Sequence, residues 1–150
     1  MDRTIIFRGK SILTGKLVYG DLLMHRAPME ICIEQNKVVQ VERGTIDQYA
    51  GFRDKHQYFV FDHDILAVDG KNHPYLIQFM DNWCGFYLMP VIDEKIVWNK
   101  PISVRGAKRQ GINIMAFDDT DNIEVVGNLH DFEAALVKFD IWFGKQQEKL

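Results

Sequence analysis

The sequence predicts a mainly β protein, a small barrel or roll that ends in one α-helix. Strand-sized apolar runs are separated by turn residues at intervals of about 8 to 12 residues, which is typical of such folds. Residues 131–150 differ, because their apolar side chains repeat at helical spacing. With 150 residues, 47% of them hydrophobic and 26% charged, the chain has the length and composition of a globular protein with its own core.

The N-terminal part is expected to form a β lobe of four short strands. The first two lie at residues 3–9 and 17–23, and Gly20 inside the second indicates a bulge or a close backbone approach. Pro28 marks a loop, because it has no N–H for a ladder hydrogen bond. Residues 29–33 and 37–41 then alternate around Gln35-Asn36, which favours a hairpin.

The second half of the chain holds the strands of the predicted barrel. We expect the longer ones at residues 58–68, 75–80 and 83–89, with Pro90 ending the third. A short hairpin of residues 91–92 and 96–98 follows, and residues 101–110 have too little apolar patterning for a strand. Two further short strands are expected at residues 112–117 and 123–126.

The last element is predicted to be a helix with one apolar face. Asp131 is a suitable N-cap, and Gly144 is expected to end the ordered part. Trp142 lies off the main apolar face, so it is a candidate for a subunit contact. The main face repeats at i, i+4, i+7 and i+11 and consists of Phe132, Leu136, Phe139 and Phe143.

Several short motifs follow one another in an order that is typical of a known family. They are Tyr19-Gly20-Asp21-Leu22, Gln48-Tyr49-Ala50-Gly51, Gly85-Phe86-Tyr87-Leu88 and Glu124-Val125-Val126-Gly127-Asn128-Leu129. In these motifs the chain resembles the YopX-like proteins carried by phages and mobile elements, a family with no assigned biochemical activity. The resemblance touches most of residues 3–136 and implies an SH3-like small barrel over residues 57–127.

Two positions depart from the family pattern. His63 and Asp47 stand where the family has glycine. If those glycines adopt a positive φ, histidine and aspartate are among the few side chains that tolerate it. We therefore expect the turn at His63 to survive. The expected organisation is an N-terminal β lobe and linker at 1–56, an SH3-like barrel at 57–130, and a helix at 131–150 that packs on the barrel.

The charge distribution leaves a nucleic-acid partner open. The net charge of −3 weighs against a domain that is basic overall. Residues 95–111 nevertheless carry five cations and no acid. Trp98 in this segment could stack on a base, although a solvated loop is the commoner meaning of such a run. The candidate phosphate-binding residues are Lys100, Arg105, Lys108 and Arg109.

The cluster most suggestive of chemistry is Asp62-His63-Asp64. Two carboxylates on one face of a strand, with a histidine nearby, could hold a divalent metal. The alternative, which we favour, is a turn in which the aspartates accept hydrogen bonds from backbone N–H groups and His63 points outward.

These observations favour a non-enzymatic accessory protein of a phage or prophage, acting as a binding or assembly module. We expect a cytoplasmic homo-oligomer without a cofactor, which contacts nucleic acid or a phage or host protein. No apolar run reaches the roughly 18 residues that span a membrane. The candidate interaction surface consists of Tyr49, Phe59, Trp83 and Trp142.

Overall fold

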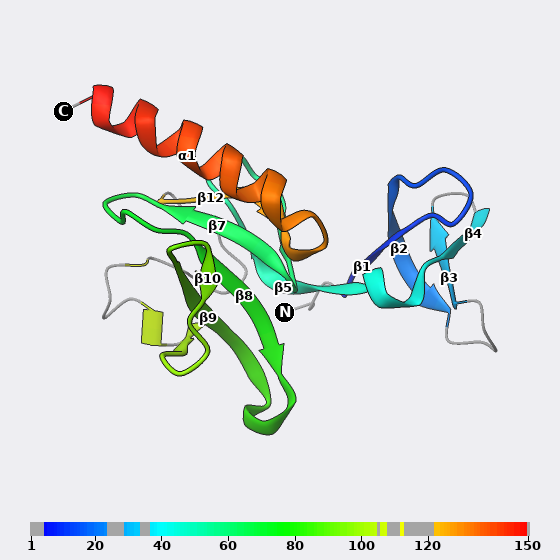
Figure 1. Ribbon diagram of the computed structural model, residues 1–150. Coiled ribbons are helices and arrows are strands. Elements are labelled where there is room, and N and C mark those ends of the chain that lie inside the picture. The colour runs from blue at the N-terminus through cyan, green and yellow to red at the C-terminus, as the bar shows by residue number, and fades with distance from the viewer. Residues whose placement is uncertain are drawn as a thin grey trace. The chain divides into compact units, whose positions relative to one another are not determined.

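The computed structural model describes residues 5–23, 29–33, 37–104, 106–107, 112 and 122–149. The chain divides into two compact units, residues 1–51 and residues 52–150. The predicted fold class is confirmed, because the chain is mainly β, its curled sheets form a half-barrel, and one α-helix follows them (Figure 1). None of the described helices is both long and apolar enough to cross a membrane.

The first unit is built on an antiparallel sheet with the strand order β4-β3-β2-β1-β5. The strands predicted at 17–23, 29–33 and 37–41 are confirmed, whereas the first begins only at Phe7. The Gln35-Asn36 turn lies outside the described residues. The bounds are β1 Phe7–Lys10, β2 Leu17–Leu23, β3 Met29–Ile33, β4 Lys37–Val41 and β5 Asp47–Arg53, with a 3-10 turn at Arg43–Thr45 between the last two.

The first unit has a small core and a buried ion pair. Ile31 and Val41 are buried against Gly9, where an added Cβ would come within 3.0 Å of Val41. Arg8 Nε donates to Asp47 Oδ2 over 2.9 Å, and both side chains are almost fully buried. This pair joins β1 to β5, which are neighbours in the sheet.

The second unit contains a sheet with the order β10-β9-β8-β7-β12, and β11 pairs with β9. All five residues of β7 are buried. Tyr75 on β8 is also buried, and burial raises the pKa of its phenol above the ordinary value. The bounds are β6 Phe59–Phe61, β7 Asp64–Val68, β8 Tyr75–Met80, β9 Gly85–Ile92, β10 Lys95–Ile96, β11 Ile102–Ser103 and β12 Ile123–Asn128, with 3-10 turns at Asp81–Trp83 and Leu129–Asp131.

Several predictions about these strands are wrong. Residues 101–110 were expected to form no strand, but Ile102–Ser103 forms β11 and pairs with β9. The strand predicted at 112–117 lies outside the described residues except for Ile112. Residues 58–68 form two strands rather than one, because the backbone turns at His63 with a φ of 71°. Pro90 does not end β9 but lies inside it, opposite Tyr75. The strand tolerates the proline because its carbonyl still accepts from Val97 N over 2.8 Å, and the next N–H, that of Val91, donates to Pro74 O over 2.9 Å.

The helix α1 spans Phe132–Glu148 and lies across β12 and β7 (Figure 1). Its buried residues are Ala135, Phe139 and Trp142, so the buried face is rotated toward Trp142 relative to the predicted stripe. Packing of this face stabilises the last turns, and the helix continues through Gly144, which was expected to end it. Asp131 stands at the N-cap position, but its side chain makes no capping hydrogen bond.

The helix approaches the sheet most closely at Gly127 of β12. A Cβ added there would lie 2.6 Å from Ala135 Cβ and 2.9 Å from Ala135 Cα. Real Cβ atoms do not come this close to another carbon. The glycine is therefore required by the approach of two backbones, and it fixes where α1 crosses the strand.

Candidate functional site: a basic groove beside the C-terminal helix

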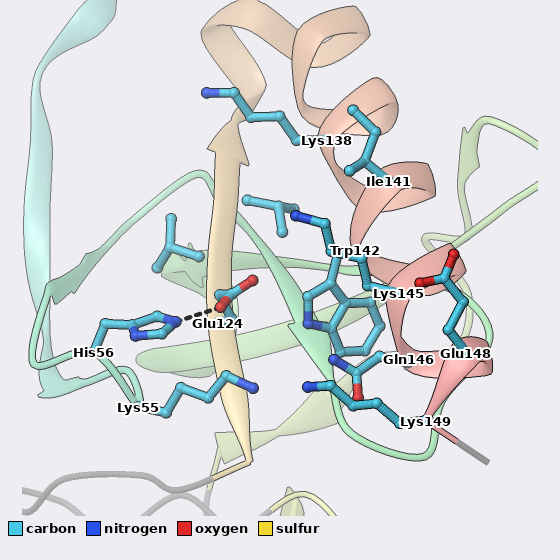
Figure 2. A pocket seen from close by; sticks show the side chains of 12 residues that line it. Lys55, His56, Glu124, Lys138, Ile141, Trp142, Lys145, Gln146, Glu148 and Lys149 are labelled. Atoms are coloured by element: carbon cyan, nitrogen blue, oxygen red, sulfur yellow. Dashed lines mark hydrogen bonds and ion pairs between the residues drawn. The ribbon is translucent and has the colours of Figure 1, made fainter.

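A groove of about 780 Å³ lies between α1 and β12. Figure 2 shows lysines of α1 on one side of it, with the turn that follows β5 on the other. We call it the basic groove. Its charged and aromatic lining residues are Lys55, His56, Glu124, Lys138, Trp142, Lys145, Glu148 and Lys149, and Val125, Val126, Ile141 and Gln146 complete the lining.

Asp54 fixes the conformation of the turn after β5, which forms one wall of the groove. This carboxylate is completely buried. Its Oδ1 accepts from the backbone N–H groups of His56 and Tyr58 over 2.9 and 3.0 Å, and its Oδ2 accepts from Val125 N over 3.0 Å. A single side chain therefore fixes the turn and also ties it to β12, so Lys55 and His56 are held at the edge of the groove.

Four lysines and two carboxylates, Glu124 and Glu148, line the groove, so it carries an excess of positive charge. The His56 ring pairs with the Glu124 carboxylate of β12 (Figure 2). Lys55 Nζ lies 3.5 Å from Asp69 Oδ1.

The lysines of α1 add charge that is not neutralised locally. Lys138 and Lys145 are two turns apart on the same side of the helix, and Lys149 follows one turn later. Within the described part of the chain, no carboxylate lies within 4.0 Å of any of the three. The groove can therefore accept an anionic group.

Trp142 borders the groove with a buried indole. Its side chain is 7% exposed, and its Nε1 has no hydrogen-bond partner among the described residues. Tyr49, in the first unit, is buried as well. These two members of the predicted interaction surface do not contribute exposed area in the single chain, because their rings are used for packing.

The other two members of that surface are exposed. Trp83 stands at the end of the β8–β9 hairpin with 48% of its surface exposed, and Phe59 on β6 is also exposed. Trp83 packs on Tyr87, with 4.9 Å between ring centroids, and Phe79 packs edge-on against Phe86 at 5.3 Å. Because Phe86 and Tyr87 are consecutive in β9, the hairpin end has one aromatic ring pair on each of its two faces, and each pair has a solvent-exposed ring.

Asp62-His63-Asp64 forms a turn, as we favoured, but the His63 side chain is only 26% exposed and its ring lies edge-on to that of His130, with 5.6 Å between centroids. Asp62 Oδ1 accepts from Phe79 N over 2.9 Å, and Asp64 Oδ2 accepts from Phe61 N over 2.8 Å. The two carboxylates therefore bond backbone groups of different strands. His63 has a positive φ of 71°, as expected if the glycine of the family adopts that conformation.

The basic segment is only partly described. Lys95 and Lys100 are exposed, and Trp98 between them is 51% exposed. Arg105, Lys108 and Arg109 lie outside the described residues. The phosphate-binding role of Lys100, Arg105, Lys108 and Arg109 stays a prediction.

Sequence reasoning missed the basic groove, because its cations come from segments far apart in the chain. The i, i+7 spacing of Lys138 and Lys145 was the available signal, since it places both on one side of a helix. The opposite wall of the groove, which carries Lys55, could not be predicted from the sequence. It is positioned by the hydrogen bonds of Asp54 to the turn and to β12.

The curled sheet and its covering helix define a small barrel-like β protein with a charged groove beside the helix. The family model described as YopX protein matches residues 7–134. The chain therefore belongs to the YopX family, and the resemblance noted in its motifs is confirmed. No curated protein matches the chain.

Proposed function

We propose that this YopX-family protein is a non-enzymatic assembly module that associates with itself and binds a protein of a phage or of its host. The observation that carries the proposal is the outer face of α1. Val137 and Ile141 lie one turn apart there and are 59% and 56% exposed. Exposed aliphatic side chains that form a stripe on a helix are typical of a surface that a partner covers.

The exposed apolar residues of α1 are not needed for its own folding. The opposite face already buries Ala135, Phe139 and Trp142 in the core of the second unit. A helix that packs only on its own domain typically has polar or charged side chains on its solvent-exposed face. Self-association of the chain through this face would remove Val137 and Ile141 from water.

The aromatic end of the β8–β9 hairpin is the proposed surface for the phage or host protein. Trp83 and Phe79 are the exposed members of its two ring pairs. Large aromatic side chains contribute most to binding energy in protein interfaces. Because this surface is separate from the outer face of α1, one chain could associate with a second copy and bind the other protein at the same time. We expect it to act in the cytoplasm.

The test is the molar mass in solution, measured by light scattering at tens of micromolar protein. We expect the wild type to form an oligomer and the double variant V137S/I141S to be monomeric. The matched control is F79S/W83S, which removes two exposed apolar residues elsewhere and should leave the oligomer intact. A monomeric wild type would remove the assembly proposal.

Nucleic-acid binding is the second candidate function. The observation that favours it is the exposed Trp98 between Lys95 and Lys100, together with the basic groove. Cations that follow a backbone and an aromatic ring that stacks on bases are the usual components of a single-strand binding surface. Such binding should weaken steeply as salt is added, because phosphate contacts release counterions.

A filter-binding assay with a single-stranded oligonucleotide at low salt tests this candidate. K100A and K149A separately probe the basic segment and the basic groove. K16A, an exposed lysine of the first unit, is the control. Retention that is absent, or that both variants leave unchanged, would end the nucleic-acid hypothesis for these surfaces.

A further inference from the structure

We infer that α1 pairs in parallel with α1 of a second copy of this chain, in a register set by ion pairs between Glu133 and Lys138 and between Asp140 and Lys145. The inference rests on the proposed self-association and adds the partner helix, its direction and the residues that select it. It comes from the distribution of charges around the exposed half of the helix.

The outer face of α1 follows a heptad pattern over two repeats. Ala134, Val137, Ile141 and Gly144 are spaced three, four and three residues apart, which places them along one seam. None of these four residues is buried in the single chain, whereas the opposite face of the same helix is buried. Alanine and glycine in the seam would allow two backbones to approach closely.

The two flanks of this seam carry opposite charges. Glu133 and Asp140 occupy one flank, and Lys138 and Lys145 occupy the other, each pair seven residues apart. All four side chains are exposed. Among the described residues none of the four has an ion-pair partner within its own chain.

Opposite flanks determine the direction of pairing. When two identical helices pair in parallel, the two-fold axis runs along them, so the acidic flank of one copy faces the basic flank of the other. When they pair antiparallel, each flank faces its own equivalent, and like charges repel. With acids at the g positions and lysines at the e positions of the heptad, only the parallel arrangement makes attractive pairs.

A second copy is a better match for this face than other partners. It supplies both charges in the required spacing, and it covers Val137 and Ile141 at the same time. A nucleic acid could neutralise Lys138 and Lys145 from the basic groove, but it would be repelled by the acidic flank and would leave the aliphatic residues exposed. The contact is small, so we expect association in the micromolar range, which is still populated at tens of micromolar protein.

Charge reversal tests the inference. K138E/K145E makes both flanks acidic, and E133K/D140K makes both basic. We expect each variant alone to dissociate at least about tenfold more readily than the wild type at about 50 mM salt, where ion pairs are weakly screened. Mixing the two variants should restore the oligomer, because every cross-copy pair is then attractive again.

The matched control is K95E/K100E, which changes the net charge by the same amount on exposed lysines outside the helix. It should keep the wild-type dissociation constant. Circular dichroism and thermal melting check that all variants are folded, and sedimentation equilibrium measures the association. High salt should bring the charge-reversed variants and the wild type closer together.

The possible outcomes separate the inference from the proposal on which it rests. A monomeric wild type would refute both. A wild-type oligomer that K138E/K145E leaves unchanged, or a mixture that stays monomeric, would refute only the parallel pairing of α1. Loss of oligonucleotide retention in K138E/K145E with an unchanged mass would assign the two lysines to a nucleic acid instead, and would also overturn the pairing.

Discussion

The inner and outer faces of α1 belong to the same 17 residues but have opposite surroundings. The inner face places Ala135, Phe139 and Trp142 among the buried residues of β7, β8, β9 and β12. The outer face presents Val137 and Ile141 between an acidic and a basic flank. The difference indicates that the inner face determines whether the second unit folds, whereas the outer face determines what the folded unit contacts.

The largest effect should come from truncation of the inner face. Phe139→Ala removes a ring that packs on Trp142 and Phe143 and leaves a cavity. We expect it to lower the free energy of unfolding by about 3–5 kcal/mol. Urea denaturation at a protein concentration where the chain is monomeric measures this change. Ile141→Ala, two residues further along the helix and on the outer face, should stay within about 0.5 kcal/mol of the wild type. If both variants lost the same free energy of unfolding, the outer face would contribute to folding as much as the inner face, and the distinction would be wrong.

A smaller effect should follow from Gly127→Ala. The added methyl group would overlap Ala135, so α1 must shift away from β12. Overpacking of this kind destabilises by about 1–3 kcal/mol. The double variant Gly127→Ala with Ala135→Gly relieves the clash and should recover part of the loss. If Gly127→Ala has the same melting temperature as the wild type, the helix does not approach the strand as closely as described.

The smallest effect, and of opposite sign, is expected for Gly144→Ala on the outer face. Gly144 lies inside α1, and an added Cβ would have no atom within 4 Å. Alanine is a better helix former than glycine, so the variant should gain about 0.5–1 kcal/mol of stability. Hydrogen exchange of the last helical turn should slow as well. A loss of stability in the monomer would mean that this face is already covered within the chain.

Much of the fold could be predicted from the sequence, because local signals and tertiary structure agree there. Strands β2 and β8 have their predicted bounds, and β8 is a mostly apolar run between Pro74 and the turn at Asp81-Asn82. Pro90 and Gly144 were misinterpreted for a common reason. Both residues weaken an isolated element, but here hydrogen bonds to neighbouring strands or packing of the helix outweigh that weakness.

The candidate site was predictable only in part. The turn at Asp62-His63-Asp64 was expected from the hydrogen-bonding habits of aspartate, and the structure confirms it. Trp142 was assigned to a surface because the aromatic stripe of Phe132 and Phe143 looked like the buried centre. The rotation of the helix depends on where Gly127 admits Ala135, which no pattern within residues 131–150 reveals.

The buried Asp54 has a consequence for any ligand of the basic groove. Because its carboxylate already accepts three backbone N–H groups, the turn that carries Lys55 and His56 is immobilised before anything binds. An incoming anion would therefore lose little conformational entropy to loop ordering. Its affinity would instead depend mainly on how much hydration the lysine side chains give up.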